Sequence, residues 1–285
     1  MTGRILAAAM TTLALASPGA AEEPALPATG SQVADGAHEQ GKPRENALRH
    51  LLDTLEIMDT PVYARNMLQL KYEWTARPEG ASLAQLTFKP LFAWGERREF
   101  VLRIEAPVET VYPSPASGLP AASGFASLTT TFFWAFYSAH GLRQAFGLEL
   151  QWNTATVAAV GQPWIIEPIY GIGYRFTDWL GATLEVNWQK SFGNLGGYLP
   201  VNTLQVKPTV TVSLPAWFFV AVQDKTSWSI QDANVGSLLK FTAGRFLTEK
   251  KSAVLAVEYE TPLDPVAAQG TVLLVGAMLS YFYEW

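Results

Sequence analysis

Charged side chains recur at every second position in several stretches of the sequence, and they are the residues best suited to chemistry. Side chains two apart share one face of a β-strand, so each stretch predicts a strand face that carries charge. The fourteen residues expected to line a shared interior are Lys71, Glu73, Lys89, Arg103, Glu105, Arg143, Glu149, Glu167, Arg175, Glu185, Lys207, Lys240, Glu258 and Glu260. Lys225 and Glu109 follow the same parity, which makes bases and acids equal in number. Such a face predicts either a hydrated path for a solute or a ladder of ion pairs that only solvate one another.

Two pairs of glutamates stand at same-face spacing, Glu105 with Glu109 and Glu258 with Glu260. Paired carboxylates of this kind can bind a hard cation or share a proton. Bases of equal number share the same faces, so we expect the carboxylates to form ion pairs, and the sequence predicts neither a metal site nor a cofactor.

Candidates for enzymatic chemistry are few. The sequence has three histidines and no cysteine, and His38 and His50 precede the predicted strands. His140 lies close to Ser138, but both fall in a predicted turn on the side opposite to that used by outer-membrane phospholipases. We therefore expect no catalytic site. Acidic residues outnumber basic ones by 25 to 20, and the bases are dispersed, which disfavours nucleic acid as a partner.

The elements that must position the charged residues are strands with a strict alternation of side chains. From residue 66, eight successive segments place apolar residues on even numbers, as in Leu68 and Leu70 against Gln69 and Lys71. These apolar faces carry no charge and many aromatic rings, which is typical of a lipid-facing belt. Four more segments follow, at residues 217–225, 235–248, 253–261 and 271–285.

Two features weaken this pattern locally. Asp224 and Arg245 fall on the face assigned to lipid, and we expect bulges or strand ends there. Pro90, Pro168 and Pro208 stand in the middle of predicted strands, where each removes a ladder hydrogen bond. Local bulging is the explanation we expect for the prolines.

The connections between the segments alternate in length, as in barrels of the outer membrane. The short ones are residues 95–99, 138–141, 177–180, 215–216 and 249–251, and the long ones are residues 112–123, 154–162, 192–201, 226–236 and 262–270. The first, at residues 76–81, is brief although it belongs to the long set. With both termini on the periplasmic side, the sequence predicts an all-β fold. The barrel is transmembrane, antiparallel and up-and-down, with about twelve strands over residues 64–285.

The region before the barrel divides into three parts. Residues 1–21 combine Arg4, an apolar run and a small-residue end, which predicts a cleaved signal peptide. Residues 22–63 form a predicted periplasmic extension, within which residues 44–58 repeat leucines at helical spacing and predict a short amphipathic helix. Its apolar stripe needs a partner. Three remain open: the barrel mouth or lumen, the inner leaflet surface, and another periplasmic protein.

The final segment, ending in LSYFYEW, resembles the last strand of Gram-negative outer-membrane β-barrels, which is aromatic at its end and is read by the barrel-assembly machinery. With the segment PIYGIGYRFTDWLGATLEVNW, the chain resembles the transporter-type barrels associated with the meta pathway of phenol degradation. The resemblance implies outer-membrane lipid as surroundings and an aromatic or otherwise hydrophobic small solute, and it carries no residue-level site.

Two functions follow as expectations. The first is passive passage of a small solute across the outer membrane through the lumen. The second is a closed structural barrel that anchors a periplasmic or surface partner protein.

Overall fold

The computed structural model describes residues 65–96, 98–137, 142–157, 161–193, 198–248, 250 and 252–283. The predicted signal peptide at residues 1–21, the extension at residues 22–63 and its helix at residues 44–58 lie outside these residues. No helix of the described part is long and apolar enough to cross a membrane.

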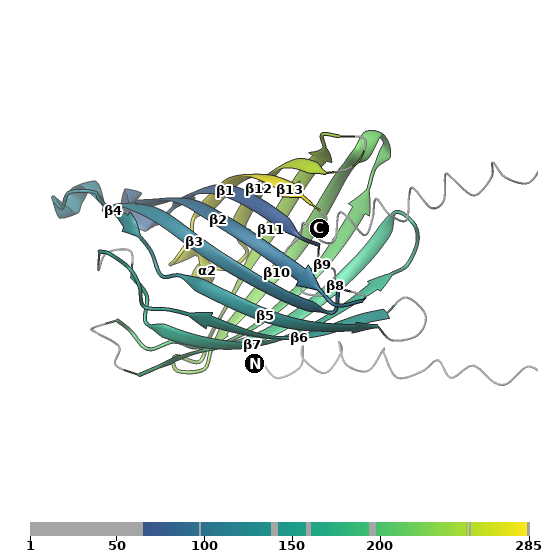
Figure 1. Ribbon diagram of the computed structural model, residues 1–285. Helices are drawn as coiled ribbons and strands as arrows, with labels where there is room; N and C mark the ends of the chain where they lie inside the picture. The colour runs from purple at the N-terminus through teal and green to yellow at the C-terminus, as the bar shows by residue number, and fades with distance from the viewer. Residues whose placement is uncertain are drawn as a thin grey trace, which may run out of the picture. The chain divides into compact units, whose positions relative to one another are not determined.

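The described chain forms one antiparallel sheet that closes on itself (Figure 1). Its strands are β1 (Met67–Ala76), β2 (Ser82–Trp94), β3 (Phe100–Tyr112), β4 (Ala122–Phe125), β5 (Thr129–Tyr137), β6 (Leu142–Gln151), β7 (Trp164–Arg175), β8 (Leu180–Phe192), β9 (Asn202–Ser213), β10 (Phe218–Ser229), β11 (Asn234–Phe246), β12 (Ala253–Pro262) and β13 (Leu273–Phe282). The helices are η1 (Pro78–Gly80), η2 (Pro115–Ser117), η5 (Pro215–Trp217) and α2 (Pro265–Ala268). Pairing of β1 with β13, from Met67 opposite Phe282 to Ala76 opposite Leu273, closes the barrel.

Twelve of these strands run up and down around the barrel, which confirms the predicted fold class. The short β4 is additional. It pairs with the second half of β3, from Val108 to Val111, while β5 pairs only with the first half, from Phe100 to Glu105. The predicted connection at residues 112–123 includes the first half of β4, because four residues are too few to show a period.

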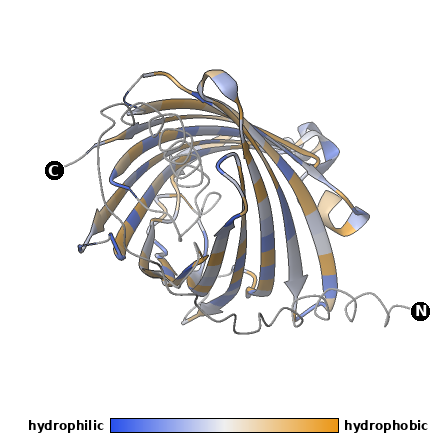
Figure 2. Ribbon diagram, turned by 90° about the vertical axis from the view of Figure 1, so that its right-hand side faces the viewer, coloured by the Kyte–Doolittle hydropathy of each residue, from blue (hydrophilic) through white to orange (hydrophobic). Residues whose placement is uncertain are grey.

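The alternation of side chains separates the two faces of the barrel wall, as the bands of hydropathy along the strands show (Figure 2). On β1, Leu70 is 47% exposed on the outside, whereas Gln69 is 2% exposed and faces the interior. Phe88 and Trp134 are likewise exposed on the outer face. A continuous apolar exterior of this kind is suited to lipid and not to water.

The three mid-strand prolines do not create bulges, so that explanation is wrong. Around Pro208 the register is the same on both sides, with Val206 opposite Thr226 and Thr209 opposite Gln223. The seams at Pro90 and Pro168 also keep their registers across the gap. Each proline lies on the outer face and omits bonds of the ladder without inserting a residue.

The two charged residues on the outer face differ in their placement. Asp224 lies inside β10 with an unbroken register, so neither a bulge nor a strand end occurs there. Its carboxylate instead accepts hydrogen bonds from the hydroxyls of Thr226 and Ser237. Arg245 is next to the last residue of β11, as expected, and its guanidinium lies 5.0 Å from the centroid of the Phe218 ring.

The connections follow the predicted alternation with one exception. The fifth connection of the long set was expected at residues 226–236, yet β10 continues to Ser229 and β11 begins at Asn234. The connection is therefore only residues 230–233. Serine, threonine and glycine at residues 226–236 suggested a loop, but they pair across the hairpin, where Thr226 lies opposite Ser237.

The interior is apolar at the end of the barrel that carries the short connections. This apolar layer consists of Met67, Leu91, Ala93, Val101, Phe133, Phe219, Ala221, Phe246, Val254, Ala256, Met278 and Phe282, all buried and close to that end of their strands. The charged interior predicted from the alternation therefore does not extend to this level of the barrel. Alternation shows which face a residue occupies but not how the interior is packed at each level along the barrel axis.

Candidate functional site

A cavity of about 310 Å³ lies inside the barrel. Its lining residues are Lys71, Glu73, Arg103, Glu105, Glu149, Glu167, Ile169, Thr183, Glu185, Gln189, Gln205, Lys207, Thr209, Gln223, Lys225, Lys240, Glu260 and Leu274. All except Ile169 and Leu274 are polar or charged. Ten of the fourteen charged residues expected to face the lumen are among them.

The other four expected residues lie elsewhere in the barrel. Lys89 and Glu258 are buried and form ion pairs with residues of the lining. Arg143 and Arg175 lie at the ends of β6 and β7, beyond the cavity. The parity of both residues is inward, but parity does not tell how far along the axis a side chain lies.

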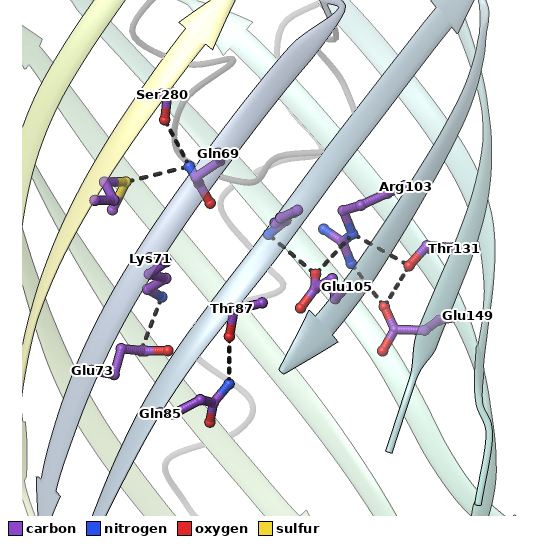
Figure 3. Close-up of polar contacts among 12 residues, drawn as sticks. Gln69, Lys71, Glu73, Gln85, Thr87, Arg103, Glu105, Thr131, Glu149 and Ser280 are labelled. Carbon is purple, nitrogen blue, oxygen red and sulfur yellow. Dashed lines mark hydrogen bonds and ion pairs between the residues drawn. The ribbon is translucent and has the colours of Figure 1, made fainter. Parts of the chain in front are cut away.

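One group of contacts, the Arg103 network, joins β2, β3, β5 and β6 (Figure 3). Arg103 Nη2 lies 2.7 Å from Glu149 Oε2, and Arg103 Nε lies 3.1 Å from Glu105 Oε1. The Thr131 hydroxyl donates to the same Glu149 oxygen at 2.7 Å, and Lys89 Nζ lies 3.1 Å from Glu105 Oε1. The carboxylates of this network are neutralised by bases and fixed on the wall.

A second group, the Glu258 network, joins β1, β11 and β12. Glu258 Oε2 lies 2.8 Å from Lys71 Nζ, and Glu258 Oε1 lies 2.6 Å from Lys240 Nζ. Lys71 also pairs with Glu73 at 2.9 Å (Figure 3). Glu258 is 4% exposed, so this carboxylate is desolvated and depends on the two lysines for its compensation.

Like charges lie opposite one another at two seams of the wall. Glu149 on β6 is the register partner of Glu167 on β7. On β9 and β10, the pairs Thr209–Gln223 and Val206–Thr226 bracket Lys207 and Lys225, which places the two lysines across from each other. Direct like-charge pairs destabilise a sheet, so folding alone does not favour this arrangement.

These pairs belong to two charged arcs on neighbouring strands. The acidic arc consists of Glu149, Glu167 and Glu185 on β6, β7 and β8, and the basic arc consists of Lys207, Lys225 and Lys240 on β9, β10 and β11. The arcs meet at one ion pair, in which Lys207 Nζ lies 2.8 Å from Glu185 Oε1. All six residues line the cavity.

Within the described part of the chain, three charged residues of the lining have no ion pair. Lys225 and Glu260 also have no hydrogen bond there, although both line the cavity. Glu167 is buried and accepts hydrogen bonds from the amides of Asn187 and Gln189, the latter at 2.8 Å, but no base lies within ion-pair distance. Among the described residues, the lumen therefore holds one cation and two carboxylates that have no ion pair.

The connection that contains α2 lies at the opposite end of the barrel from the apolar layer. The N–H groups of Ala267 and Val266 donate to Asp264 Oδ1 at 2.9 Å each, and the N–H of Ser237 donates to Oδ2. These backbone hydrogen bonds, that of Ala267 foremost, hold the pKa of Asp264 below its ordinary value. A Cβ added at Gly236 would lie 3.1 Å from the backbone of Ala267, so α2 packs closely on β11.

Sequence reasoning did not select the uncharged members of the lining. Thr183, Gln189, Gln205, Thr209 and Gln223 have inward parity, and that signal alone was available to find them. Lys225, which was expected to face inward although it was not among the fourteen, also lines the cavity.

The residues considered for enzymatic and metal chemistry can be placed in part. His38, His50, Ser138 and His140 lie outside the described residues. Among the residues that the structure describes, no group of three histidine or carboxylate side chains is arranged to hold a metal ion. Of the four glutamates considered for cation binding, Glu105 and Glu258 each form two ion pairs with bases.

Comparison with known proteins identifies relatives in structure only. No family model and no curated protein matches the sequence. An outer membrane channel from Pseudomonas putida F1 superimposes with a TM-score of 0.63 at 11% identity, covering 77% of this chain and 95% of that chain. The chain is also similar to the NanC porin, with a TM-score of 0.53 at 10% identity, covering 76% of this chain and 100% of that chain. The KdgM porin superimposes with a TM-score of 0.53 at 8% identity, covering 76% of this chain and 99% of that chain. At these identities the likeness shows a shared fold.

Proposed function

We propose that the protein is an outer-membrane channel for the passive passage of a small solute. The observation that carries the proposal is the cavity of about 310 Å³ inside a closed barrel, lined by sixteen polar or charged residues and two apolar ones. A barrel that serves only as a scaffold gains no stability from an interior of this kind, because burying charge is costly unless every charge is paired. Three described solved structures with this fold are named as a channel or as porins, which agrees with the proposal.

The charged lining favours a small polar solute. A solute in the cavity would contact ammonium, carboxylate and amide groups on nearly every side. An aromatic or hydrophobic solute, which the resemblance to phenol-degradation barrels implies, would find apolar surface mainly in the apolar layer at the other level. It would have to displace water from the charged groups first, at a cost that its own burial does not offset.

Placement in the membrane follows from the same reasoning. The apolar exterior requires lipid, and a barrel of this type reaches the outer membrane by export. We therefore propose that residues 1–21 are a cleaved signal peptide and that the final strand is the segment read by the barrel-assembly machinery. Residues 22–63 are proposed to remain on the periplasmic side.

The decisive experiment is conductance of the purified protein in planar lipid bilayers. A channel gives stepwise increases of current in potassium chloride, and preparations of the refolded barrel that show no steps would contradict the proposal. A folded barrel without conductance, which co-purifies with a partner protein, would support the anchoring function instead. A variant that keeps the signal peptide but lacks residues 22–60 tests whether the extension obstructs the lumen. If the extension is a plug, its deletion should give larger or more frequent conductance steps.

A further inference from the structure

The interior of the barrel separates charge to an extent that stability does not require. Three consecutive strands carry the acidic arc and the next three carry the basic arc, and each arc includes a pair of like charges on adjacent strands. Opposite charges across each seam would be more favourable for the sheet. The arrangement instead produces an electric field across the cavity, directed from the basic arc to the acidic arc.

Most charges of the arcs are compensated within the wall. Lys207 is paired with Glu185, Lys240 is paired with Glu258, and Glu149 is paired with Arg103. A solute that bound to any of these would have to break an existing ion pair. These residues therefore shape the field but are poor sites for direct binding.

Lys225 and Glu260 differ from the others. Neither has an ion pair or hydrogen bond in the part of the chain that the structure describes, and both line the cavity. Glu260 is 8% exposed. The two lie on strands separated only by β11. Within the described residues, an ammonium and a carboxylate without an ion pair thus line one cavity from strands that are not neighbours.

We propose that the solute is a small zwitterion, whose anionic group binds the Lys225 ammonium and whose cationic group binds the Glu260 carboxylate. An anion would be attracted by the Lys225 ammonium but repelled by the Glu260 carboxylate. A cation would be attracted by the Glu260 carboxylate but repelled by the Lys225 ammonium. A molecule that carries both charges satisfies both residues and is aligned by the field between the arcs. The class is that of small amino acids and related betaines. This inference rests on the proposed channel function.

The experiment compares glycine with glycolamide in the swelling of liposomes that contain the refolded full-length protein. The two molecules are isomers of almost equal size and neither has a net charge, so the ratio of their rates reports the zwitterion alone. Two new ion pairs of modest strength predict that glycine enters about three to ten times faster than glycolamide. Lys225→Gln and Glu260→Gln should each bring this ratio close to one. Lys190→Gln removes a positive charge from the outer face, as Lys225→Gln does from the interior, and should keep the ratio of the unmodified protein.

The outcomes separate the two proposals. Equal rates for glycine and glycolamide in the unmodified protein would overturn the zwitterion while leaving the channel intact, as would a ratio that both variants preserve. Absence of swelling with either solute, together with absence of conductance, would overturn the channel itself. Because neither residue has a partner in the described wall, both variants are expected to fold, and a heat-dependent shift in gel mobility checks this.

Discussion

Glu258 is the residue whose removal should reveal how far the interior ion pairs stabilise the barrel. Its carboxylate contacts Lys71 at 2.8 Å and Lys240 at 2.6 Å, with only 3% of its side chain exposed. Glu258→Gln preserves the shape and removes the charge. In this variant Lys71 retains its ion pair with Glu73 at 2.9 Å. Lys240 loses its ion pair with Glu258, which is the one ion pair that it forms within the described residues. Breaking a buried ion pair costs about 3–5 kcal/mol, and we expect about 3 kcal/mol because the lysines face a hydrated cavity.

The measurement is urea unfolding of the protein refolded in lipid vesicles, followed by tryptophan fluorescence. Glu79→Gln, at an exposed glutamate in the first connection, is the matched control and should change the free energy of unfolding by less than about 0.5 kcal/mol. The double variant Glu258→Gln with Lys240→Gln removes both charges and should cost only about 1 kcal/mol. The reasoning fails if Glu258→Gln is as stable as the control. It also fails if the free energy of unfolding lost by the double variant equals the sum of the losses caused by its two single substitutions, because the desolvated carboxylate would then not depend on its lysines.

Three further predictions concern the wall and the rims. Gly244→Val should lower the free energy of unfolding by about 1–3 kcal/mol, because its Cβ would lie 2.5 Å from a phenylalanine ring, whereas Gly270→Ala, with its nearest neighbour at 3.9 Å, should be neutral in the same assay. A cysteine in place of Asp232 should react with an impermeant maleimide on intact cells and one in place of Glu96 only after disruption of the outer membrane; the reverse pattern would invert the topology. Backbone hydrogen bonds lower the pKa of Asp264 in the folded protein below its ordinary value of 3.8. The stabilisation that the Asp264 carboxylate gives to the start of α2 is therefore complete above pH 3.8 and is lost as the pH falls through the lower pKa of the folded state. Amide hydrogen exchange at residues 263–272, corrected for the intrinsic rate, should therefore be constant from pH 5 to 8 and rise only below about pH 4, and a rise near pH 6 would contradict this assignment.

Much of the barrel was predictable because alternation and loop length report on the same geometry. The parity of Leu70 and Lys71 fixes which side chain faces outward, and each further strand of the same parity repeats the information. The charged lining follows from this parity. The pairing of Lys71 with Glu258 does not, since it depends on the closing seam and on how far the strands are staggered along the axis.

The features that the sequence did not predict are those without a period. β4 is too short for an alternation to be recognised, and the hairpin at residues 230–233 has polar residues on both faces of its strands. The apolar layer was missed because an inward phenylalanine such as Phe133 looks like an interruption of a polar face. It is explained only when the structure shows that its ring packs against Gly147 of the neighbouring strand.

The closing seam between β1 and β13 has a consequence for the kinetics of folding. Gln69 donates a hydrogen bond to Ser280 at 3.0 Å, a contact between residues 211 positions apart in the chain. Such contacts carry the largest loop-closure entropy and form late. Until the last strand is in place, β1 and every partial sheet expose an unpaired edge with apolar side chains, which is a template for aggregation. The chain must therefore be kept from misassembly along its whole length until its final strand arrives.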